Sequence, residues 1–463
     1  MRTSKRLTAL AVVLALAAAA CAGQGGSPTP TAAPSAAPTE AAFDWQKHSG
    51  TEITFLANQH PWTDGMTPLL DQFTADTGIK VNVQPFAEDL YFDKMEQAIR
   101  AAQGTADVYF FPMDSTGYSQ FTANAVEPLT PYLDDPTKTS PDYDFADFPA
   151  GFLGGGTYPP GDASAQVYGV PISFETYILF YNKDLVAKYL GGTVPATFDE
   201  LIAAAQKINT EGAKDGVTGA VMRGIRSDTI MDTLSGVVWN AWGAADAPAP
   251  YGMWFDGGWD KPRLTDPKVC QGLANYGKLL AAGPSNKFAI DWPDANTLFS
   301  QGKAAFFIDA SLFGPSYEDP NASQVAGKVG YSVLPPVTAG GDSFTGHWLW
   351  GLAIPKNSTN KDAAWYFVQW MTDKANTAKI GAATGGAPRL SSYSDPVYTG
   401  KLNPDYVATV NKAMQTSRTT VVFKEGWKDG ALTIADTELA IAQGTDPTAA
   451  CAAGNDALGA AVK

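Results

Sequence analysis

The strongest hydrophobic pattern in the chain lies between residues 167 and 185, which read VYGVPISFETYILFYNKDL. Alternating apolar residues and a proline lead into an almost continuous apolar run from Tyr177 to Tyr181. A run this rich in aromatic and β-branched residues is typical of a buried strand. One carboxylate, Glu175, stands just before the run. An acid at the mouth of a buried strand must be paired, solvated at an edge, or directed at a ligand.

Before this stretch, strand patterns alternate with helix patterns. Strands are predicted within residues 52–57, 76–83 and 106–111, and helices around residues 69–73 and 95–102. This order predicts a doubly wound parallel sheet, in which ligands lie at the carboxyl ends of the strands. The candidate residues in the three loops that leave those ends are His60 and Trp62, Glu88 and Asp89, and Asp114.

Local patterns also indicate how other parts of the chain fold. Thr197 and Glu200 form a capping-box pattern, which predicts the start of an amphipathic helix. Residues 362–371 predict another amphipathic helix, and residues 238–242 are rich in tryptophan. Residues 27–42 are rich in Pro, Ala and Thr without a hydrophobic period, which predicts a disordered, extended tether.

The first 20 residues combine a basic start with an apolar segment from Leu7 to Ala20. The segment has the length of a signal-peptide core and is too short to span a bilayer. Cys21 follows at once, as in a bacterial lipoprotein signal, where this cysteine becomes the lipidated N-terminus. We therefore expect a lipoprotein anchored at the extracellular face of the cytoplasmic membrane, with residues 21–42 as its tether. Ala18 replaces the leucine usual in that signal, so ordinary cleavage near Ala20 is the alternative.

Length and charge limit the classes of protein to consider. At 463 residues the chain is long enough for two lobes or domains. It carries 32 basic and 47 acidic residues and a formal net charge of −15, which argues against a nucleic-acid partner. Its 12 tryptophans must be mostly core, but this density also suits a carbohydrate cleft, because a ring face covers the C–H face of a sugar.

Motifs for catalysis or metal binding are missing from the sequence. With only His48, His60 and His347 there is no HExxH pair or Cys/His metal spacing, and no GxSxG elbow occurs. Residues 272–278 fit GxxxxGK, but Leu279 replaces the Ser or Thr of a phosphate loop, and the segment reads as helix interior. We predict no metal, no cofactor and no enzyme. Glycan hydrolases use a pair of carboxyl groups, and this acidic chain contains many acids that could form such a pair. An exported glycan hydrolase is therefore the alternative from another class of protein.

Several ordered passages resemble the extracellular solute-binding proteins of bacterial sugar importers, the group that includes the maltose-binding proteins. They are residues 167–185, the TFDE helix start at 197–200, the DTGIKVNV turn and strand, GKAAFFID at 302–309, GHWLWGLAIPK at 346–356 and ATGGAPR at 383–389. The resemblance implies a type II, two-lobed α/β fold whose doubly wound sheets are joined by three crossovers, near residues 173, 334 and 387. The N-terminal lobe would comprise residues 43–173 and 335–387, and the C-terminal lobe residues 174–334 and 388–463.

The strand-end loops, the tryptophan-rich passage and this resemblance together indicate which residues contact a ligand in the cleft between the lobes. The candidates are Glu175, Trp348, Asp114, Arg389, Trp62, His60, Glu88, Trp242, Asp309 and Trp427. Glu175 and Trp348 are expected on opposite walls of the cleft. Each main candidate has a structural alternative: Glu175 as a strand-edge acid, Asp114 as a helix cap, the tryptophans as core and Arg389 as a surface residue. In maltose-binding proteins a stacking tryptophan follows the GKAA strand, whereas Leu312 stands about there in this chain.

The resemblance also bears on the cysteines and on the function. Cys270 and Cys451 both fall in the second lobe, which permits a disulfide in an exported chain; two buried thiols are the alternative. The implied function is that of a monomer that captures a mono- or oligosaccharide, closes over it and delivers it to the permease of an ABC transporter. A polyol, a glycerol phosphate or a peptide is the alternative ligand.

Overall fold

The structure, a computed structural model, describes residues 42–243, 252–256, 261–419, 422–424 and 426–462. The predicted signal segment, Cys21 and the tether up to residue 41 lie outside these residues. Among the described residues, no helix combines the length and the apolar character needed to cross a membrane.

One mixed sheet forms the centre of the described chain. Its strands follow the order β2-β1-β3-β10-β6-β8-β7, with β11 paired to β10 and β9 paired to β6, and a separate hairpin pairs β4 with β5. The strands are β1 (Glu52–Asn58), β2 (Lys80–Phe86), β3 (Val108–Pro112), β4 (Thr157–Tyr158), β5 (Gln166–Val167), β6 (Val170–Asn182), β7 (Thr218–Val221), β8 (Ala304–Ala310), β9 (Val329–Ser332), β10 (Thr345–Ala353) and β11 (Ser417–Thr419).

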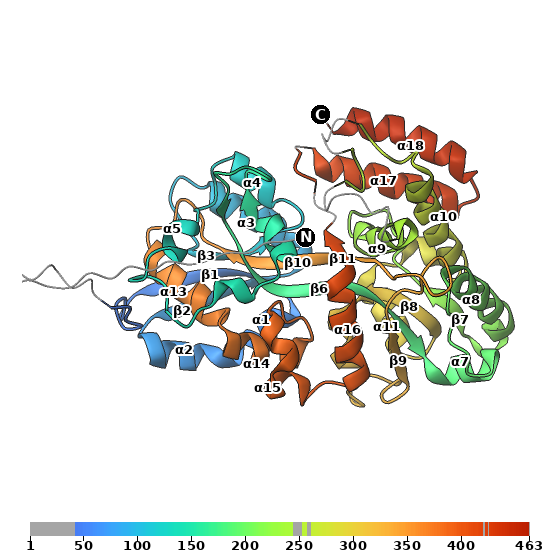
Figure 1. Cartoon of the computed structure of the whole chain (residues 1–463), viewed down its shortest axis with the longest axis horizontal. Helices are drawn as coiled ribbons and strands as arrows, with labels where there is room; N and C mark the ends of the chain where they lie inside the picture. The colour runs from blue at the N-terminus through green and yellow to red at the C-terminus, as the bar shows by residue number, and fades with distance from the viewer. Residues whose placement is uncertain (1–41, 244–251, 257–260, 420–421, 425, 463) are drawn as a thin grey trace, which may run out of the picture. The chain divides into compact units, whose positions relative to one another are not determined.

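Helices lie on both sides of this sheet (Figure 1). Those before β6 are α1 (Pro61–Met66), α2 (Leu70–Thr77), α3 (Glu88–Arg100), α4 (Gly117–Thr122), α5 (Thr130–Leu133) and α6 (Ala150–Leu153). Those after β6 are α7 (Lys183–Leu190), α8 (Phe198–Gly212), α9 (Ile230–Trp242), α10 (Pro267–Ala281), α11 (Trp292–Ser300), α12 (Gly314–Tyr317), α13 (Lys361–Met371), α14 (Lys374–Thr384), α15 (Pro396–Thr399), α16 (Pro404–Thr416), α17 (Trp427–Ala442) and α18 (Pro447–Ala461). Short 3-10 turns are η1 (Thr67–Leu69), η2 (Phe145–Asp147), η3 (Gly154–Gly156), η4 (Ala213–Asp215), η5 (Lys287–Ala289), η6 (Ser311–Phe313) and η7 (Leu390–Ser394).

The long strand β6 joins the two halves of the sheet. Its residues 170–176 pair antiparallel with β10, whereas its residues 177–182 pair with β8 and β9. Figure 1 shows it passing from the strands β1, β2 and β3 towards β7, β8 and β9. We call the first three strands and the helices packed on them the N-lobe, and the last three strands with their helices the C-lobe. The predicted buried strand is therefore confirmed, and it links two strand groups that the sequence predicted as separate sheets.

Local chemistry explains where the predicted helices begin. Thr197 Oγ1 accepts a hydrogen bond from the backbone N–H of Glu200 at 3.2 Å, one residue before α8 starts. The Glu200 carboxylate accepts from the N–H of Ala196, instead of the Thr197 N–H that a capping box uses. The GxxxxGK segment, residues 272–278, lies inside α10, so its reading as helix interior is confirmed.

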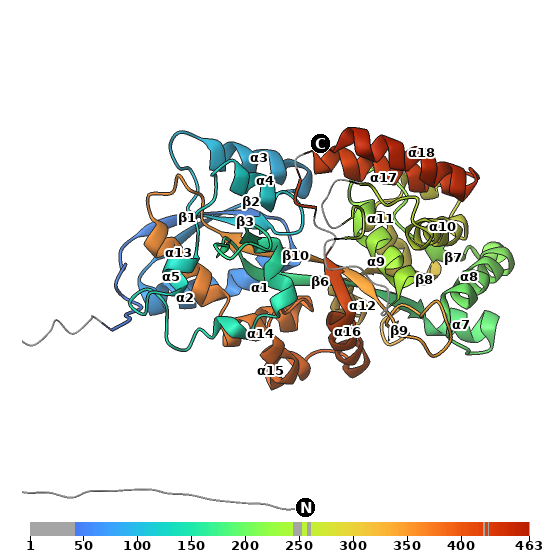
Figure 2. The same cartoon turned by 45° about the horizontal axis from the view of Figure 1, so that its top comes forward.

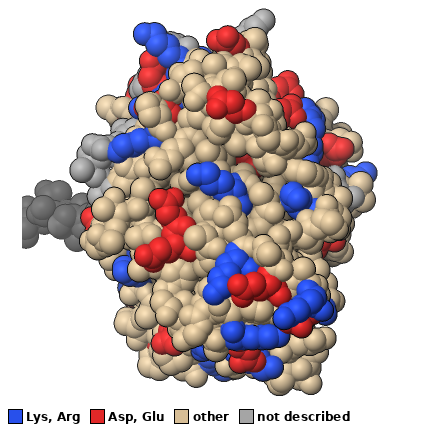
Figure 3. Space-filling model, turned by 90° about the vertical axis from the view of Figure 1, so that its right-hand side faces the viewer, with Lys and Arg blue, Asp and Glu red and all other residues tan. Residues whose placement is uncertain are grey.

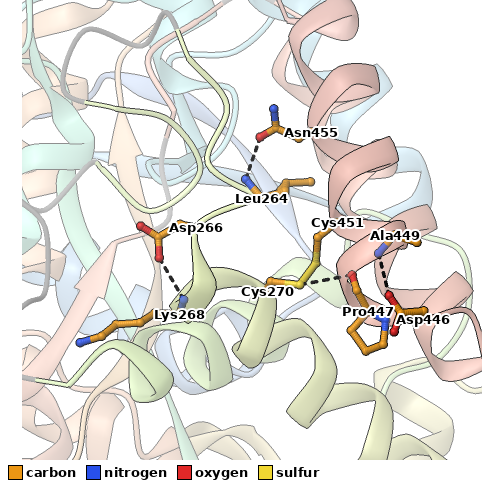
Figure 4. Close-up of a disulfide and its surroundings, with 9 residues drawn as sticks. All are labelled: Leu264, Asp266, Lys268, Cys270, Asp446, Pro447, Ala449, Cys451 and Asn455. Carbon is orange, nitrogen blue, oxygen red and sulfur yellow. Dashed lines mark hydrogen bonds between the residues drawn. A yellow bond between two sulfur atoms is a disulfide. The ribbon is translucent and has the colours of Figure 1, made fainter.

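A disulfide joins Cys270 on α10 to Cys451 on α18, with the two Cα atoms 6.0 Å apart (Figure 4). The helices α10, α17 and α18 lie side by side in both views of the ribbon (Figures 1 and 2). The bridge closes a loop with a sequence separation of 181 residues, which restricts the unfolded chain. It therefore ties the last helix to the rest of the C-lobe.

The third change of lobe occurs later in the chain than the expected position near residue 387. Ser391 donates a hydrogen bond to the carboxylate of Asp147, and α15 packs on the N-lobe helix α14. The next helix, α16, packs on β6 and β9 instead. The chain therefore leaves the N-lobe after Thr399, because contacts far apart in sequence hold residues 390–399 there.

Basic and acidic side chains are interspersed on the face seen from the right of Figure 1 (Figure 3). This face carries the C-lobe helices α7 and α8. Mixed charge of this kind offers no continuous basic surface to a nucleic-acid backbone.

One fully buried acid, Glu438 on α17, forms no ion pair with any residue that the structure describes. Neither carboxylate oxygen has a hydrogen-bond partner among the described residues. Burial raises the pKa of Glu438 to about 8, so its carboxyl group holds a proton in the folded protein at neutral pH.

We predict that Glu438→Gln makes the stability less dependent on pH. The folded pKa lies above the unfolded one, so the contribution of Glu438 is fully present below the unfolded pKa and falls as the pH rises towards the folded value. Between about pH 5 and about pH 8, the free energy of unfolding of the wild type should fall relative to that of the variant. The difference should grow by roughly 1.4 kcal/mol per pH unit. Urea unfolding across this range measures the difference. Glu211→Gln, at an exposed position on α8, is the control, and a pH-independent difference for Glu438→Gln would contradict the prediction.

Candidate functional site

The carboxyl ends of β1, β2 and β3 meet at one edge of the N-lobe sheet, because these strands run parallel. His60 follows β1 and caps α1, with its Nδ1 accepting a hydrogen bond from the N–H of Trp62 at 3.1 Å. Glu88, the first residue of α3, comes soon after β2. Asp114 follows β3. The sequence-predicted loop residues therefore do come from one edge.

A hydrogen bond between His60 and Glu175 connects this edge to the middle of β6. Because Nδ1 of His60 is an acceptor, the proton of a neutral ring is on Nε2, which donates to Oε1 of Glu175 at 3.1 Å. Glu175 is only 8% exposed, so the carboxylate requires a partner. Its other oxygen, Oε2, has no hydrogen-bond partner in the described part of the chain.

Glu175 and Trp348 are cross-strand neighbours. β6 and β10 pair antiparallel with Glu175 opposite Trp348, which directs both side chains to the same face of the sheet. Trp350, two residues further along that face, is buried and lies 6.2 Å from the His60 ring, measured between centroids. Trp348 stays partly exposed. The expectation of opposite walls is wrong, because the register of the two strands fixes where these side chains point.

Glu88 lies where groups of both lobes come close. Its side chain is partly buried and has no hydrogen-bond partner among the residues that the structure describes. Burial is the main cause that raises the pKa of Glu88; the charges of Glu175 and Asp291 add to the rise, and those of His60 and Arg223 oppose it. Because Arg223 and Asp291 belong to the C-lobe, Glu88 faces charged groups of that lobe.

Arg223 stands just beyond the carboxyl end of β7, at the corresponding edge of the C-lobe sheet. Its buried guanidinium donates to both oxygens of Asp309 on β8, at 3.0 and 2.5 Å. It also donates to Oδ2 of Asp232, in the first turn of α9, at 2.6 Å. Asp309 is fully buried, so its carboxylate is committed to Arg223 and does not fit the expected ligand contact. The side chain of Asp232 is 20% exposed.

Asp114 lies beside β10, between the ends of β3 and β11. Thr419 Oγ1 donates to Oδ1 of Asp114 at 2.8 Å, and the backbone of Leu349 also donates to the carboxyl group. Oδ2 lies 4.0 Å from Nε2 of His347, and neither atom has a hydrogen-bond partner among the described residues. Burial raises the pKa of Asp114 to about 7 and lowers that of His347 to about 3, so the two do not form an ion pair at neutral pH. Asp114 does not cap α4, which has no side-chain cap.

Known proteins identify the family to which this arrangement belongs. A family model described as "Bacterial extracellular solute-binding protein" matches residues 57–378. The chain belongs to this family.

Two curated relatives are named for polyols. The chain is 29% identical over 375 residues to an erythritol/L-threitol-binding protein of Mycolicibacterium smegmatis, covering 79% of this chain and 75% of the relative. It is 31% identical over 238 residues to a mannitol-binding protein of Pseudomonas aeruginosa, about half of each chain, with 50% and 51% covered.

Experimental structures show the same fold. A solute-binding protein of an ABC transporter from Agrobacterium vitis, with bound D-mannitol, matches with a TM-score of 0.70 and 23% identity over 88% of this chain and 97% of that one. One from Thermotoga lettingae, with bound α-D-tagatose, matches with a TM-score of 0.73 and 20% identity over 89% and 99%. The predicted two-lobed fold of solute-binding proteins is therefore confirmed.

Arg389 has a structural position in this solute-binding protein. Its fully buried guanidinium donates to the backbone carbonyls of Thr372, Asp144 and Tyr143 and to the carboxylate of Asp147. The expected ligand contact does not fit this position, because N-lobe acceptors engage the guanidinium and no solvent reaches it. The surface alternative is wrong for the same reason.

The other aromatic candidates lie mostly in the core. Trp62 is buried against Phe55 and Phe110. Trp242 is buried at the end of α9, with the guanidinium of Arg263 4.7 Å from its ring centroid. Trp427 begins α17 and is partly buried. Trp348 is thus the candidate ring that stands partly exposed beside Glu175.

Sequence reasoning missed Arg223 and Asp232, because it read residues 197–330 as helices and loops between the recognised passages. Strand β7 is only four residues long, Thr218–Val221, and its alternation is too short to detect. Had it been recognised, the carboxyl-end rule that found His60 would also have found Arg223. The structure groups no three His, Cys, Asp or Glu side chains in a way that could hold a metal ion, within the residues it describes.

We predict that Arg389→Met destabilises the fold without acting on a ligand directly. Removing the guanidinium takes away hydrogen-bond donors from three carbonyl groups and from the carboxylate of Asp147, so the free energy of unfolding should fall by roughly 3–5 kcal/mol. Chemical denaturation measures this loss. Arg226→Met, in the exposed ion pair with Asp436, is the control and should change stability little. Wild-type stability combined with lost ligand binding would contradict the structural assignment and restore Arg389 to the site.

Proposed function

We propose that this solute-binding protein captures a small polyol or sugar between its lobes and delivers it to the membrane subunits of an ABC transporter. The proposal rests on carboxylates that reach the same region from β6 and from both lobes: Glu175, Glu88 and Asp232. Each has at least one oxygen without a hydrogen-bond partner among the described residues. A partly buried carboxyl oxygen without a partner accepts a hydrogen bond from a hydroxyl group, and the protonated carboxyl group of Asp232 can also donate one. Trp348 adds a ring face beside Glu175 for the C–H groups of the ligand.

The balance of charge favours a neutral ligand rich in hydroxyl groups. Arg223 already donates to Asp309, to Asp232 and to the carbonyl of Thr229, so it does not provide a free cation for a phosphate. Acids therefore outnumber available bases around the site, which argues against glycerol phosphate. The names of the relatives, which refer to erythritol, L-threitol and mannitol, support a polyol, and the structure with tagatose supports a small sugar.

Capture requires the two lobes to move relative to each other. β6 runs through both lobes, and β10 pairs along it, so bending at these strands would open and close the region around Glu175. A ligand that contacts both lobes stabilises the closed form by the difference in its affinity for the two forms. No bond is broken in this process, and incubated oligosaccharides should be recovered intact.

We also propose that Cys21 carries a lipid anchor, on the sequence pattern alone. We predict that the mature protein partitions into detergent, because one or more acyl chains transfer favourably from water. Cys21→Ser should release the protein to the medium, as measured by fractionation of cells. Equal membrane retention of the variant would contradict the anchor.

The function is tested with a panel of erythritol, L-threitol, ribitol, D-mannitol, D-tagatose, maltose and glycerol 3-phosphate. Thermal shift should show a higher melting temperature with at least one polyol or small sugar, by mass action, and calorimetry should confirm binding. Binding of glycerol 3-phosphate in preference to every neutral compound would contradict the proposed ligand class.

We predict that Glu175→Ala and Trp348→Ala each weaken the binding found in this panel by roughly ten- to a hundred-fold. Glu175→Gln should be milder, because the amide keeps an acceptor, and Trp348→Phe should be milder because it keeps a ring. Titration calorimetry and a melting curve without ligand are measured for each variant, with exposed Glu211→Ala as the control. A variant of Trp348 that melts several degrees lower and yet binds normally would make Trp348 part of the core.

A further inference from the structure

Helix α9 of the C-lobe is seated on the face of the sheet that carries Glu175. A Cβ atom added to Gly346 would lie 2.5 Å from Oγ of Ser235, and one added to Gly236 would lie 3.1 Å from Cβ of Tyr177. Gly346 and Tyr177 are two residues from Trp348 and Glu175, so they lie on the same face as that pair. The absence of two side chains thus lets α9 approach β6 and β10 closely.

Asp232 lies one turn before Gly236 on α9. Residues four apart share a face of a helix, so Asp232 is on the side of α9 that faces the sheet. Its Oδ2 is held by Arg223 at 2.6 Å, and its Oδ1 has no hydrogen-bond partner in the described part of the chain. With a fifth of its side chain exposed, Asp232 is the member of the Arg223 cluster that a solute can reach, unlike the fully buried Asp309.

The surroundings hold this carboxyl group in one orientation. Arg223 donates to Asp309 on β8 and to the carbonyl of Thr229 at 2.8 Å, and these bonds fix its guanidinium. The hydrogen bond from Arg223 to Asp232 therefore has a defined direction. A hydrogen-bonding group that is fixed before binding loses little conformational freedom when a ligand arrives. A fixed group also discriminates between hydroxyl positions better than a mobile one.

We propose that Asp232 is a specificity-determining residue, which binds a hydroxyl group of the polyol or sugar through Oδ1 from the C-lobe while Glu175 binds another from β6. This assignment rests on the proposed function. The ligand would thereby bridge the central strand and the first turn of α9, and the position of its hydroxyl groups along the carbon chain would decide whether both carboxyl groups are satisfied. A compound lacking the matching hydroxyl would leave a partly buried carboxyl group without a partner.

The protonation state of Asp232 suits this role. Burial raises its pKa to about 8; the charge of Arg223 opposes the rise, and those of Glu175 and Asp309 add to it. Tyr177, Tyr276 and Glu88 are titratable groups that share parts of this electrostatic environment. A carboxyl group protonated at neutral pH both donates to and accepts from a hydroxyl group, as an amide does. Asp232→Asn is therefore a close substitute for the wild-type side chain, whereas Asp232→Ala removes both functions.

The test is titration calorimetry of the full chain with erythritol, ribitol, D-mannitol and D-tagatose. For a compound that the wild type binds, Asp232→Ala should weaken binding by roughly ten- to a hundred-fold, and Asp232→Asn should keep most of the affinity. Asp436→Ala is the matched control, because Asp436 also pairs with an arginine of the C-lobe but at an exposed position, and it should bind as the wild type does. Melting curves without ligand accompany every variant, and Asp232→Asn serves if the alanine variant does not fold.

A series of monodeoxy derivatives of the compound bound identifies the contact itself. For one derivative, the loss from the missing hydroxyl and the loss from Asp232→Ala should not add, because both remove the same hydrogen bond. If the wild type binds the parent compound and Asp232→Ala binds it equally well, or if the losses add for every derivative, the assignment of Asp232 is overturned and the proposed function stands. If the wild type binds none of the compounds, the proposed function fails, and the assignment fails with it.

Discussion

A single buried strand that passes through both lobes constrains the rest of this structure. β6 has neighbours along its whole length, β10 on its first half and β8 and β9 on its second. An acid within such a strand is tolerated only if something compensates its loss of water. His60 provides this compensation, and it does so from the carboxyl end of β1, a different part of the chain. Glu175 is the one charged residue of β6. Its need for a partner requires that the N-lobe edge carrying His60 lies beside the middle of this strand.

The two lobes use buried arginines for different purposes. Arg389 donates to backbone carbonyls and to Asp147, which holds the segment after α14 against the N-lobe. Arg223 donates to both oxygens of Asp309 and so balances the charge of that buried carboxylate. It also donates to a second acid, Asp232. Removing either arginine would leave buried acceptors unsatisfied, which is why both positions are structural. The cluster around Arg223 includes Asp232, whose side chain is 20% exposed, whereas Asp147 beside Arg389 is 10% exposed.

The final part of the chain returns to the N-lobe before it ends in the C-lobe. β11 pairs with the start of β10, Thr419 binds Asp114 at the end of β3, and Phe423 packs against Tyr118 and Tyr158. The chain then enters α17 and α18, and the disulfide fixes α18 to α10. The proposed movement of the lobes would consequently act on this last segment as well as on β6 and β10, because the segment has contacts on both sides.

The sequence by itself determined the elements whose signals are local. The apolar run around Tyr177, the parallel order of the first three strands and the helix start at Thr197 each depend on neighbouring residues, and periodicity and capping chemistry reveal them. The carboxyl ends of these strands placed His60 and Glu88 among the site candidates, and the passages that resemble solute-binding proteins identified the two-lobed fold and added Glu175. The tertiary structure decided what depends on contacts between distant residues. Strand register put Trp348 beside Glu175, burial made Arg389 a structural residue, and the short strand β7 brought Arg223 to Asp232. A side chain's partners are set by which segments the fold brings together, and that information is not contained in the residue's own neighbourhood.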